Sequence, residues 1–336
     1  MIYQGDALAV LRTFEDQSIQ CCVTSPPYWG LRDYGVKKQL GLESTPEKYV
    51  ARIVEVFSEV WRVLRNDGTL WLVLGDSYAT GGGKVGNCPG GGAQGARWKG
   101  PTTQANRMPI IGLKPKDLVG IPWRVAFALQ ADGWFLRSDI IWAKPNPMPE
   151  SVTDRPTKAH EYLFLLTKNE RYFYDAEAIK EPASEDTHAR YARGRSDHHK
   201  WADGGPGNQT IATNKPGSKF ARKLAAPGSG IKNNSSFDAA MAIMPETRNK
   251  RSVWTVTTKP YKGAHFATFP PKLIEPCILA GCPEGGTVLD PFAGAGTTLL
   301  VAEQHGRQGI GIELNPAYIK LAKARLREMK PLTMAA

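Results

Sequence analysis

The sequence has little that favours a membrane-spanning, disulfide-bonded or metal-binding protein. Its five cysteines form no C-x-x-C pair and no regular framework, which argues against disulfides and against a zinc site. No apolar run approaches the ~20 residues of a membrane-spanning helix, and the first residues lack the basic-then-apolar pattern of a signal peptide. We therefore expect a soluble, cytoplasmic protein that binds no metal.

The sequence does contain a regular alternation of strand-like and helix-like segments. Short apolar runs typical of strands lie at residues 19–24, 69–74, 134–142, 162–167, 287–290 and 308–313. Helical spacing of apolar residues covers 46–64, 122–131, 271–280, 297–305 and 316–329, and Asn66-Asp67-Gly68 predicts a turn after the first of these helices. The alternation predicts an α/β fold with a mostly parallel sheet. The strands at 134–142 and 162–167, with no long helix between them, predict an antiparallel edge.

Two segments interrupt this alternation. Residues 80–112 are glycine-rich and have no periodicity, which predicts a mobile loop or a lid. Residues 187–262 hold 14 Arg and Lys residues against 4 acidic ones, a net +10 within a chain whose total net charge is +11. Two interpretations stay open for this basic insert: a recognition module for a polyanion, or a solvated insertion whose charge only aids solubility.

The basic insert supplies the candidate nucleic-acid contacts. His188, His198 and His199 have no cysteine or carboxylate at ligand spacing, so solvent or phosphate contacts suit them better than a metal does. Aromatic side chains at Trp201, Phe220 and Trp254 fit base stacking and a small local core equally well. The candidate DNA-binding residues are Arg190, Arg193, Arg195, Lys219, Arg222, Lys223, Arg248, Lys250 and Arg251.

A glycine-rich turn follows the strand at residues 287–290. It reads Asp290-Pro291-Phe292-Ala293-Gly294-Ala295-Gly296-Thr297-Thr298 and opens a strand–helix–strand unit. Glycine lets the backbone approach a ligand closely at a helix N-terminus. Glu313 follows Asp290 by 23 residues (313 − 290), near the offset at which an acid meets ribose hydroxyls. The unit predicts a nucleoside cofactor, although the glycines alone could serve only close helix–strand packing.

Near the other end of the chain, Thr24-Ser25-Pro26-Pro27-Tyr28 follows a strand. The two prolines exclude a helix and lack backbone donors, so they leave carbonyl oxygens at the strand end. These carbonyls and the Ser25 hydroxyl can accept the hydrogens of an exocyclic amine, while Tyr28 or Trp29 stacks on the ring that bears it. The alternative is a structural turn with a core tyrosine.

Together these motifs resemble the amino-methylating DNA methyltransferases, which modify cytosine N4 or adenine N6 with S-adenosylmethionine. The resemblance rests on residues 24–28 as the catalytic motif, 290–297 as the methyl-donor motif and 309–313 as the ribose-binding strand. It also includes Gly5-Asp6-Ala7-Leu8, similar to the segment near the cofactor's adenine, and His265-Phe266-Ala267-Thr268-Phe269-Pro270, similar to the segment near its methionine part. The catalytic motif precedes the basic insert and the cofactor motif, as in the circularly permuted β group.

The resemblance implies a Rossmann-like methyltransferase fold in three parts: a catalytic half at residues 1–182, a basic target-recognition insert at 183–262 and a cofactor half at 263–330. It implies double-stranded DNA as substrate, a base flipped out of the duplex, and a bacterial or phage origin. No nuclease signature is present, so a restriction endonuclease would be a separate chain; a homodimer stays open. The implied catalytic residues are Ser25, Pro26, Pro27 and Tyr28, and the implied cofactor-binding residues are Asp6, His265, Phe266, Thr268, Asp290, Pro291, Phe292, Gly294, Gly296, Thr297 and Glu313.

Several alternatives accompany this interpretation. In the family, serine at the first position of the Pro-Pro-Tyr motif is more often associated with cytosine N4, so we expect N4, with adenine N6 as the alternative. Cytosine C5 chemistry at Cys277 is disfavoured because Cys277 lies in an apolar helical pattern and no Glu-Asn-Val segment is present. A catalytically silent DNA-binding protein and an RNA or protein-amide methyltransferase are the remaining alternatives. Asp76 could line the site or cap the next turn.

Overall fold

The computed structural model describes residues 1–31, 33–36, 38–79, 113–183, 246–258 and 269–328. The chain divides into two compact units, Met1–Ile179 with Arg251–Ala336, and Lys180–Lys250. In the described part of the second unit, β6 (Glu181–Pro182) pairs antiparallel with β7 (Thr247–Arg248). Among the residues described, no helix is long and apolar enough to cross a membrane. The three functional parts expected from the sequence stay a prediction.

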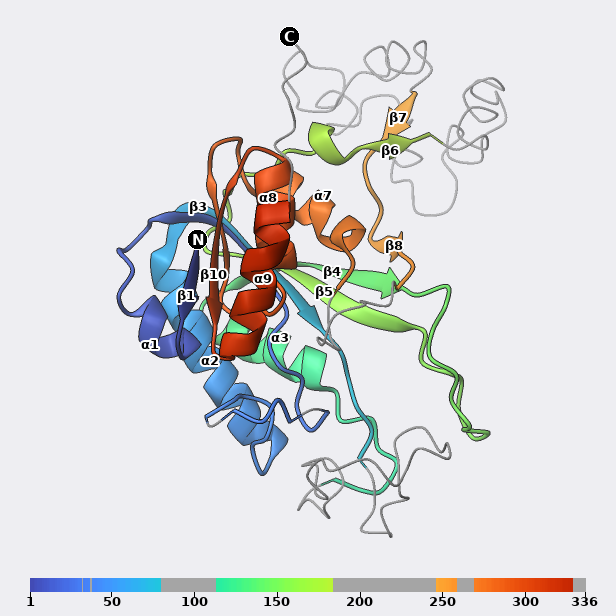
Figure 1. Cartoon of the computed structure of the whole chain (residues 1–336). Coiled ribbons are helices and arrows are strands. Elements are labelled where there is room, and N and C mark those ends of the chain that lie inside the picture. Colours follow the sequence, from blue (N-terminus) through green and yellow to red (C-terminus); the bar gives the residue numbers. More distant parts are fainter. Residues whose placement is uncertain (32, 37, 80–112, 184–245, 259–268, 329–336) are drawn as a thin grey trace, which may run out of the picture. The chain divides into compact units, whose positions relative to one another are not determined.

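An eight-stranded sheet forms the centre of the first unit (Figure 1). Its order is β1 (Ile2–Gln4), β10 (Gln308–Glu313), β9 (Thr287–Asp290), β2 (Ile19–Thr24), β3 (Leu64–Leu74), β5 (His160–Thr167), β4 (Phe135–Ala143) and β8 (Val253–Thr255). All pairings are parallel except those of β5, which is antiparallel to both β3 and β4. Only β5 therefore runs against the other strands, which confirms the mostly parallel sheet with an antiparallel addition.

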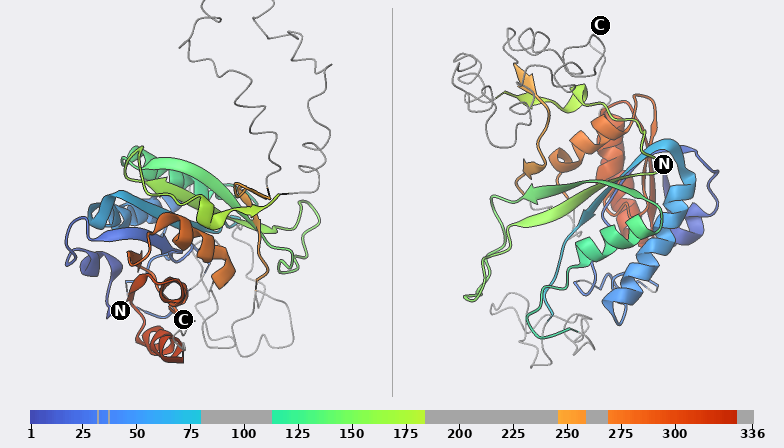
Figure 2. Two further views of the ribbon diagram at one scale, coloured as in Figure 1. Left: turned by 90° about the horizontal axis from the view of Figure 1, so that it is seen from above. Right: turned by 180° about the vertical axis from the view of Figure 1, so that it is seen from behind.

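Helices cover both faces of this sheet (Figures 1 and 2). One face carries α1 (Ala7–Leu11), α2 (Pro46–Val63) and α3 (Ile121–Ala131), and the other carries α7 (Pro271–Gly281), α8 (Thr297–Gln304) and α9 (Pro316–Glu328). Alternate side chains of one strand point to opposite faces. In β3, Leu70, Leu72 and Leu74 accordingly enter the core with α2, whereas Trp71 and Val73 enter the core with α7. A short 3-10 helix, η3 (Glu177–Ile179), packs near α7.

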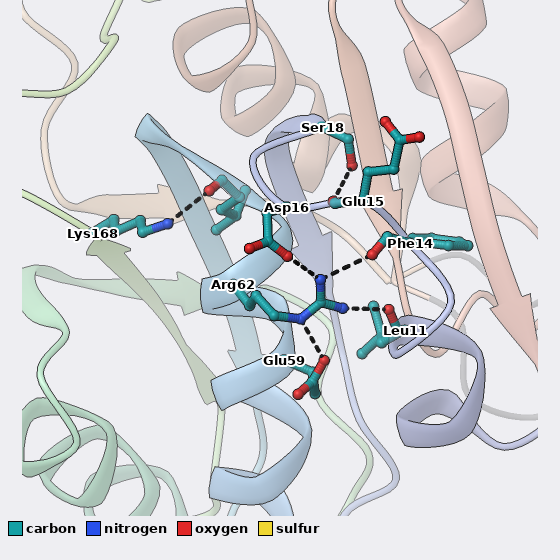
Figure 3. A network of polar contacts seen from close by, with 9 residues as sticks. Leu11, Phe14, Glu15, Asp16, Ser18, Glu59, Arg62 and Lys168 are labelled. Atoms are coloured by element: carbon teal, nitrogen blue, oxygen red, sulfur yellow. Dashed lines mark hydrogen bonds and ion pairs between the residues drawn. The ribbon is translucent and has the colours of Figure 1, made fainter.

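Arg62, near the end of α2, holds the segment between α1 and β2 in place (Figure 3). Its guanidinium donates to the carbonyl oxygens of Leu11 and Phe14, each at 2.9 Å. It also forms ion pairs with the carboxylates of Asp16 and Glu59. Because this segment leads directly into β2, the arginine fixes the strand that carries the predicted catalytic motif.

The predicted turn at residues 66–68 is wrong, because α2 passes directly into β3 and these residues belong to the strand. The register between β2 and β3 nevertheless jumps: Ile19 pairs with Leu64, but Cys21 pairs with Thr69. The residues between them bulge out of the ladder, and Gly68 suits the bulge because an added Cβ would lie 3.0 Å from two backbone carbonyl oxygens. The sequence pattern also gives no signal for β1 and β8, which are three residues each.

The topology brings the predicted motifs to one edge of the sheet. Parallel strands end at the same edge, so the residues that follow β1, β2, β9 and β10 lie side by side there. Because β5 runs in the opposite direction, its first residues lie at this edge too. His160 and Glu161 pair there with Ala143 and Trp142 at the end of β4. This edge is where a ligand site is expected in an open α/β sheet.

Candidate active site

An open cavity lies at this edge of the sheet, with about 1000 Å³ of free space including its mouth. It joins the two motifs that the sequence separates. The predicted residues that line it are Asp6, Ser25, Pro27, Asp290, Pro291, Phe292, Gly294, Thr297 and Glu313. Tyr34, Gln39, Arg52, Phe269, Asn315 and Tyr318 also line it, and of these only Phe269 falls within a motif noted in the sequence.

Asp290, the last residue of β9, is buried and held by three donors from the chain. Its Oδ1 accepts from the Thr24 hydroxyl at 2.6 Å and from the Phe292 amide at 3.0 Å, and its Oδ2 accepts from the Thr298 hydroxyl at 2.6 Å. A carboxylate offers about four acceptor sites, so at most about one remains. Burial raises the pKa of Asp290 to about 6. Asp290 therefore ties β2, the glycine-rich turn and α8 together; direct cofactor binding by it stays a prediction.

Glu313, the last residue of β10, is less fully occupied. Its Oε2 accepts from the Gly294 amide at 2.9 Å and its Oε1 accepts from the Asn315 amide at 2.6 Å. About two acceptor sites therefore remain on the carboxylate. Burial raises the pKa of Glu313 above its ordinary value. Asp6 adds a third carboxylate to the cavity wall, beside those of Asp290 and Glu313, while its Oδ1 caps α1 by accepting from Ala9.

The two glycines of the turn differ in what they do. Gly294 lines the cavity and has a φ of +50°. Gly296 stands at the start of α8 with a φ of +73°, and an added Cβ would lie 2.9 Å from Cβ of Ala322 in α9. At Gly296 the glycine thus serves close helix packing, the alternative that the sequence left open; its assignment to cofactor binding stays a prediction. Arg325 of α9 donates to the Ala295 carbonyl at 2.6 Å and to Thr297 Oγ1 at 3.1 Å, and so supports the turn from outside.

The Ser25-Pro26-Pro27-Tyr28 segment leaves β2 at the edge of the sheet where the cavity lies. Ser25 and Pro27 line the cavity, whereas Pro26 is buried. The Pro27 carbonyl accepts from the Tyr49 hydroxyl at 2.9 Å, so Tyr49 of α2 holds the turn in shape. The ring of Tyr28 lies against Gly75, where an added Cβ would come within 2.5 Å of Tyr28 Cε2. Only glycine at position 75 leaves room for the ring in this position.

The Tyr28 hydroxyl lies between a serine and a carboxylate. It accepts from Ser25 Oγ at 3.2 Å and donates to Glu161 Oε2 at 2.8 Å. Glu161, at the start of β5, forms an ion pair with Lys144, which follows β4. Burial, and then the nearby Glu161 carboxylate, raises the pKa of Tyr28 well above its ordinary value. Sequence patterns alone do not reveal Glu161 or Lys144, because Glu161 lies 133 residues from Tyr28 along the chain.

The structure also shows the contacts of four further residues considered in the sequence analysis. For three of them two roles were open, and for the fourth, Cys277, packing was expected. Asp76 caps α3, because its Oδ1 accepts from the amides of Ser77, Gly120 and Ile121. Trp29 is 1% exposed and its Nε1 donates to the Glu43 carbonyl, so of Tyr28 and Trp29 only Tyr28 remains a candidate for base stacking. Cys277 is fully buried in α7, as its apolar pattern predicts. Trp254 packs against Trp71 in the core, with ring centroids 6.4 Å apart.

Some predicted site residues lie outside the described residues. These are His265, Phe266 and Thr268 of the cofactor set, and Arg190, Arg193, Arg195, Lys219, Arg222 and Lys223 of the DNA-binding set, together with the glycine-rich segment at 80–112. Of the described basic residues, Arg248 forms an ion pair with Glu181 at 2.9 Å, and the Arg251 carbonyl accepts from Trp254. DNA binding by Arg248, Lys250 and Arg251 stays a prediction.

Comparison with known proteins shows similarity to DNA methyltransferases over nearly the whole chain. The family model of the N6/N4 type, described as DNA methylase, matches residues 19–324. The Type II methyltransferase M.XycI of Xanthomonas campestris pv. cyanopsidis is 47% identical over 331 residues, which cover 97% of this chain and 87% of the relative. The similarity therefore includes both motifs that meet at the cavity.

Two solved structures have a similar fold. The PvuII DNA methyltransferase (cytosine-N4-specific) aligns with a TM-score of 0.58 at 20% identity, covering 98% of this chain and 86% of that chain. A Thermus thermophilus protein assigned as a DNA modification methylase, in complex with S-adenosyl-L-methionine, aligns with a TM-score of 0.54 at 22% identity, covering 97% and 92%. At these identities the two structures support the fold.

Proposed function

Because the chain belongs to the N6/N4 family of DNA methylases, and is therefore an S-adenosylmethionine-dependent DNA methyltransferase, we propose that it methylates the N4 amine of a cytosine in double-stranded DNA. The observation that carries this proposal is the Ser25 hydroxyl, which lies at the cavity and donates to Tyr28. Its lone pairs thus remain for an N–H donor such as an exocyclic amine. Serine at this position, rather than Asp or Asn, favours cytosine N4 over adenine N6 by analogy with the family.

The cavity residues suit the chemistry of the methyl donor. Glu313 retains about two acceptor sites for ribose hydroxyls, and Phe292 offers an aromatic face to a purine ring. When bound there, S-adenosylmethionine supplies an electrophilic methyl group on a sulfonium sulfur. Ser25, on the wall of the same cavity, holds the amine toward that methyl group. Transfer of the methyl group then depends on positioning and electrostatics, with no covalent attachment of the base to the protein.

A base inside a duplex cannot reach this cavity, so the target base must leave the stack. Tyr28 is the aromatic residue of the motif on which it would stack, and the basic insert would hold the flanking phosphates. M.XycI is named a Type II methyltransferase, which supports a role in restriction–modification with the endonuclease as a separate chain. We infer a bacterial or phage enzyme acting in the cytoplasm.

Product analysis tests the proposal. The protein is incubated with unmethylated genomic DNA and labelled S-adenosylmethionine, and the DNA is digested to nucleosides that are separated by chromatography. We expect N4-methyldeoxycytidine with the wild-type protein and a large loss of it with Ser25→Ala. N6-methyldeoxyadenosine as the product would select the adenine alternative. Label that enters RNA or protein but not DNA would overturn the proposal.

A further inference from the structure

Three side chains from distant parts of the sequence form one hydrogen-bonded chain that begins at the cavity. Ser25 Oγ donates to Tyr28 Oη at 3.2 Å, and Tyr28 Oη donates to Glu161 Oε2 at 2.8 Å. The other carboxylate oxygen, Glu161 Oε1, accepts from Lys144. Ser25 lines the cavity, whereas the Glu161 side chain is 19% exposed. This series of hydrogen bonds therefore connects the methyl-donor cavity to the Glu161 carboxylate, which is partly exposed to solvent.

The direction of each hydrogen bond follows from the chemistry of the groups. An ionised carboxylate can only accept, so the Tyr28 hydrogen points to Glu161 and the Tyr28 oxygen accepts from Ser25. The raised pKa of Tyr28 keeps its hydroxyl protonated near neutral pH. Ser25 consequently presents lone pairs, not a hydrogen, to the cavity. The three groups are set to receive a proton at one end and to pass one on at the other.

Methylation of an amine requires that a proton leave the nitrogen, and these hydrogen-bonded side chains can carry it. When the amine nitrogen bonds to the methyl carbon and the carbon–sulfur bond breaks, the electron pair leaves with sulfur as a neutral thioether. The nitrogen then carries one hydrogen more than the neutral methylamino product. Neither the thioether nor the prolines of the motif can take this proton, since a thioether is a very weak acceptor and proline has no basic side chain. A proton acceptor in hydrogen-bond reach of the amine is required.

We propose that Glu161 accepts this proton through Ser25 and Tyr28. One hydrogen of the amine moves to Ser25 Oγ, the Ser25 hydrogen moves to Tyr28 Oη, and the Tyr28 hydrogen moves to Glu161 Oε2. Ser25 and Tyr28 end with the same number of hydrogens as before, and Glu161 becomes a carboxylic acid that returns its proton to water. Lys144 is a positioning residue that holds the carboxylate toward Tyr28. The inference rests on amine methylation and holds for cytosine or adenine.

Single-turnover methylation tests the relay, with the full-length protein in excess over DNA and saturating S-adenosylmethionine. Glu161→Gln keeps the shape but not the proton-accepting charge, and Tyr28→Phe keeps the ring but removes the hydroxyl. We expect each change to slow methylation by about 10²-fold, the lower end of general acid–base contributions. The double variant should be no slower than either single variant, because both changes interrupt the same path. Glu47→Gln, which alters an exposed carboxylate paired with Arg124, should methylate at the wild-type rate.

Two further measurements separate a relay from a structural role. Calorimetry should give unchanged S-adenosylmethionine affinity in both single variants, and the wild-type rate should fall in D₂O while the variant rates do not. A Glu161→Gln protein that methylates within twofold of wild type would overturn the inference. So would single-variant losses that multiply in the double variant, which indicate independent effects. The nucleoside formed by the wild-type protein in the same assay tests the proposed function separately, since it identifies the methylated base whatever the variants do.

Discussion

Replacing Asp290 with asparagine should change how the stability of the fold depends on pH. Asp290 is buried with a pKa of about 6, above the ordinary value of 3.8. A carboxyl group whose pKa is raised on folding binds its proton more tightly in the folded state. Its contribution to the free energy of unfolding is therefore fully present below about pH 4 and is lost as the pH rises through about 6.

The size of this effect follows from the shift. A difference of about two pKa units corresponds to roughly 3 kcal/mol, at about 1.4 kcal/mol per unit. Asparagine keeps the shape of the side chain and does not titrate. Its neighbours Thr24 and Thr298 donate to Asp290 now, and each hydroxyl can rotate to accept from the asparagine amide instead. The variant should therefore fold, and at pH 8 it should lack the cost of a buried charge.

Urea unfolding of the wild-type protein and of Asp290→Asn, followed by tryptophan fluorescence from pH 3.5 to 8, measures the effect. The wild-type free energy of unfolding minus that of the variant should fall by roughly 3 kcal/mol between about pH 4 and pH 7 and then stay level. The difference is the proper readout because the pKa of Glu313 is also raised, so its titration contributes to both proteins. Asp132→Asn, at an exposed residue bonded to Ser58, controls for the loss of one charge. A difference that is flat or rises with pH would refute the reasoning.

Three other predictions concern the cofactor site and the insert. Glu313→Ala should weaken S-adenosylmethionine binding tenfold to a hundredfold, the effect of losing a charged hydrogen bond of about 1.5–3 kcal/mol, as calorimetry can measure. Gly296→Ala should destabilise the fold by about 1–3 kcal/mol, whereas Gly285→Ala, with a similar φ of +74° but no atom within 4 Å, should show only the strain of its backbone conformation. Neutralising the Arg and Lys residues of 188–251 in groups should lower DNA affinity and flatten its salt dependence, with donor binding unchanged; a variant that still binds and methylates its site would place recognition elsewhere.

Much of the fold could be predicted because its signals are local. The apolar runs that became β2 and β9 and the helical spacing of α2 are visible within windows of a few residues. The strand–glycine turn–helix–strand unit also singled out Asp290, Gly294 and Glu313, which line the cavity. The same local reasoning placed a turn at residues 66–68, because Asn-Asp-Gly has the composition of a turn, whereas the chain uses it for a bulge within β3.

The parts that could not be predicted depend on pairing across the sheet. Asp290 has the sequence signature of a ligand-binding residue, yet its carboxylate is occupied mainly by Thr24 and Thr298, one of which comes from β2. Glu161 lies on an antiparallel strand whose first residues reach the active edge only because of its direction. No periodicity or short motif encodes such contacts. They follow from strand order, which the sequence alone does not specify.

We place the target base, out of the duplex, against the ring of Tyr28 and beside Ser25 on the wall of the cavity. The most direct test is to measure DNA binding and single-turnover methylation by the wild-type protein, Tyr28→Phe and Tyr28→Ala on duplexes that are matched or mismatched at the target base. A mismatch lowers the cost of flipping, so the wild-type protein and Tyr28→Phe should bind the mismatched duplex more tightly. Tyr28→Ala should bind both duplexes more weakly, by about 1–3 kcal/mol of lost stacking. Equal binding of each duplex by Tyr28→Ala and Tyr28→Phe, with no effect of the mismatch, would contradict this placement and show that Tyr28 is only a structural residue.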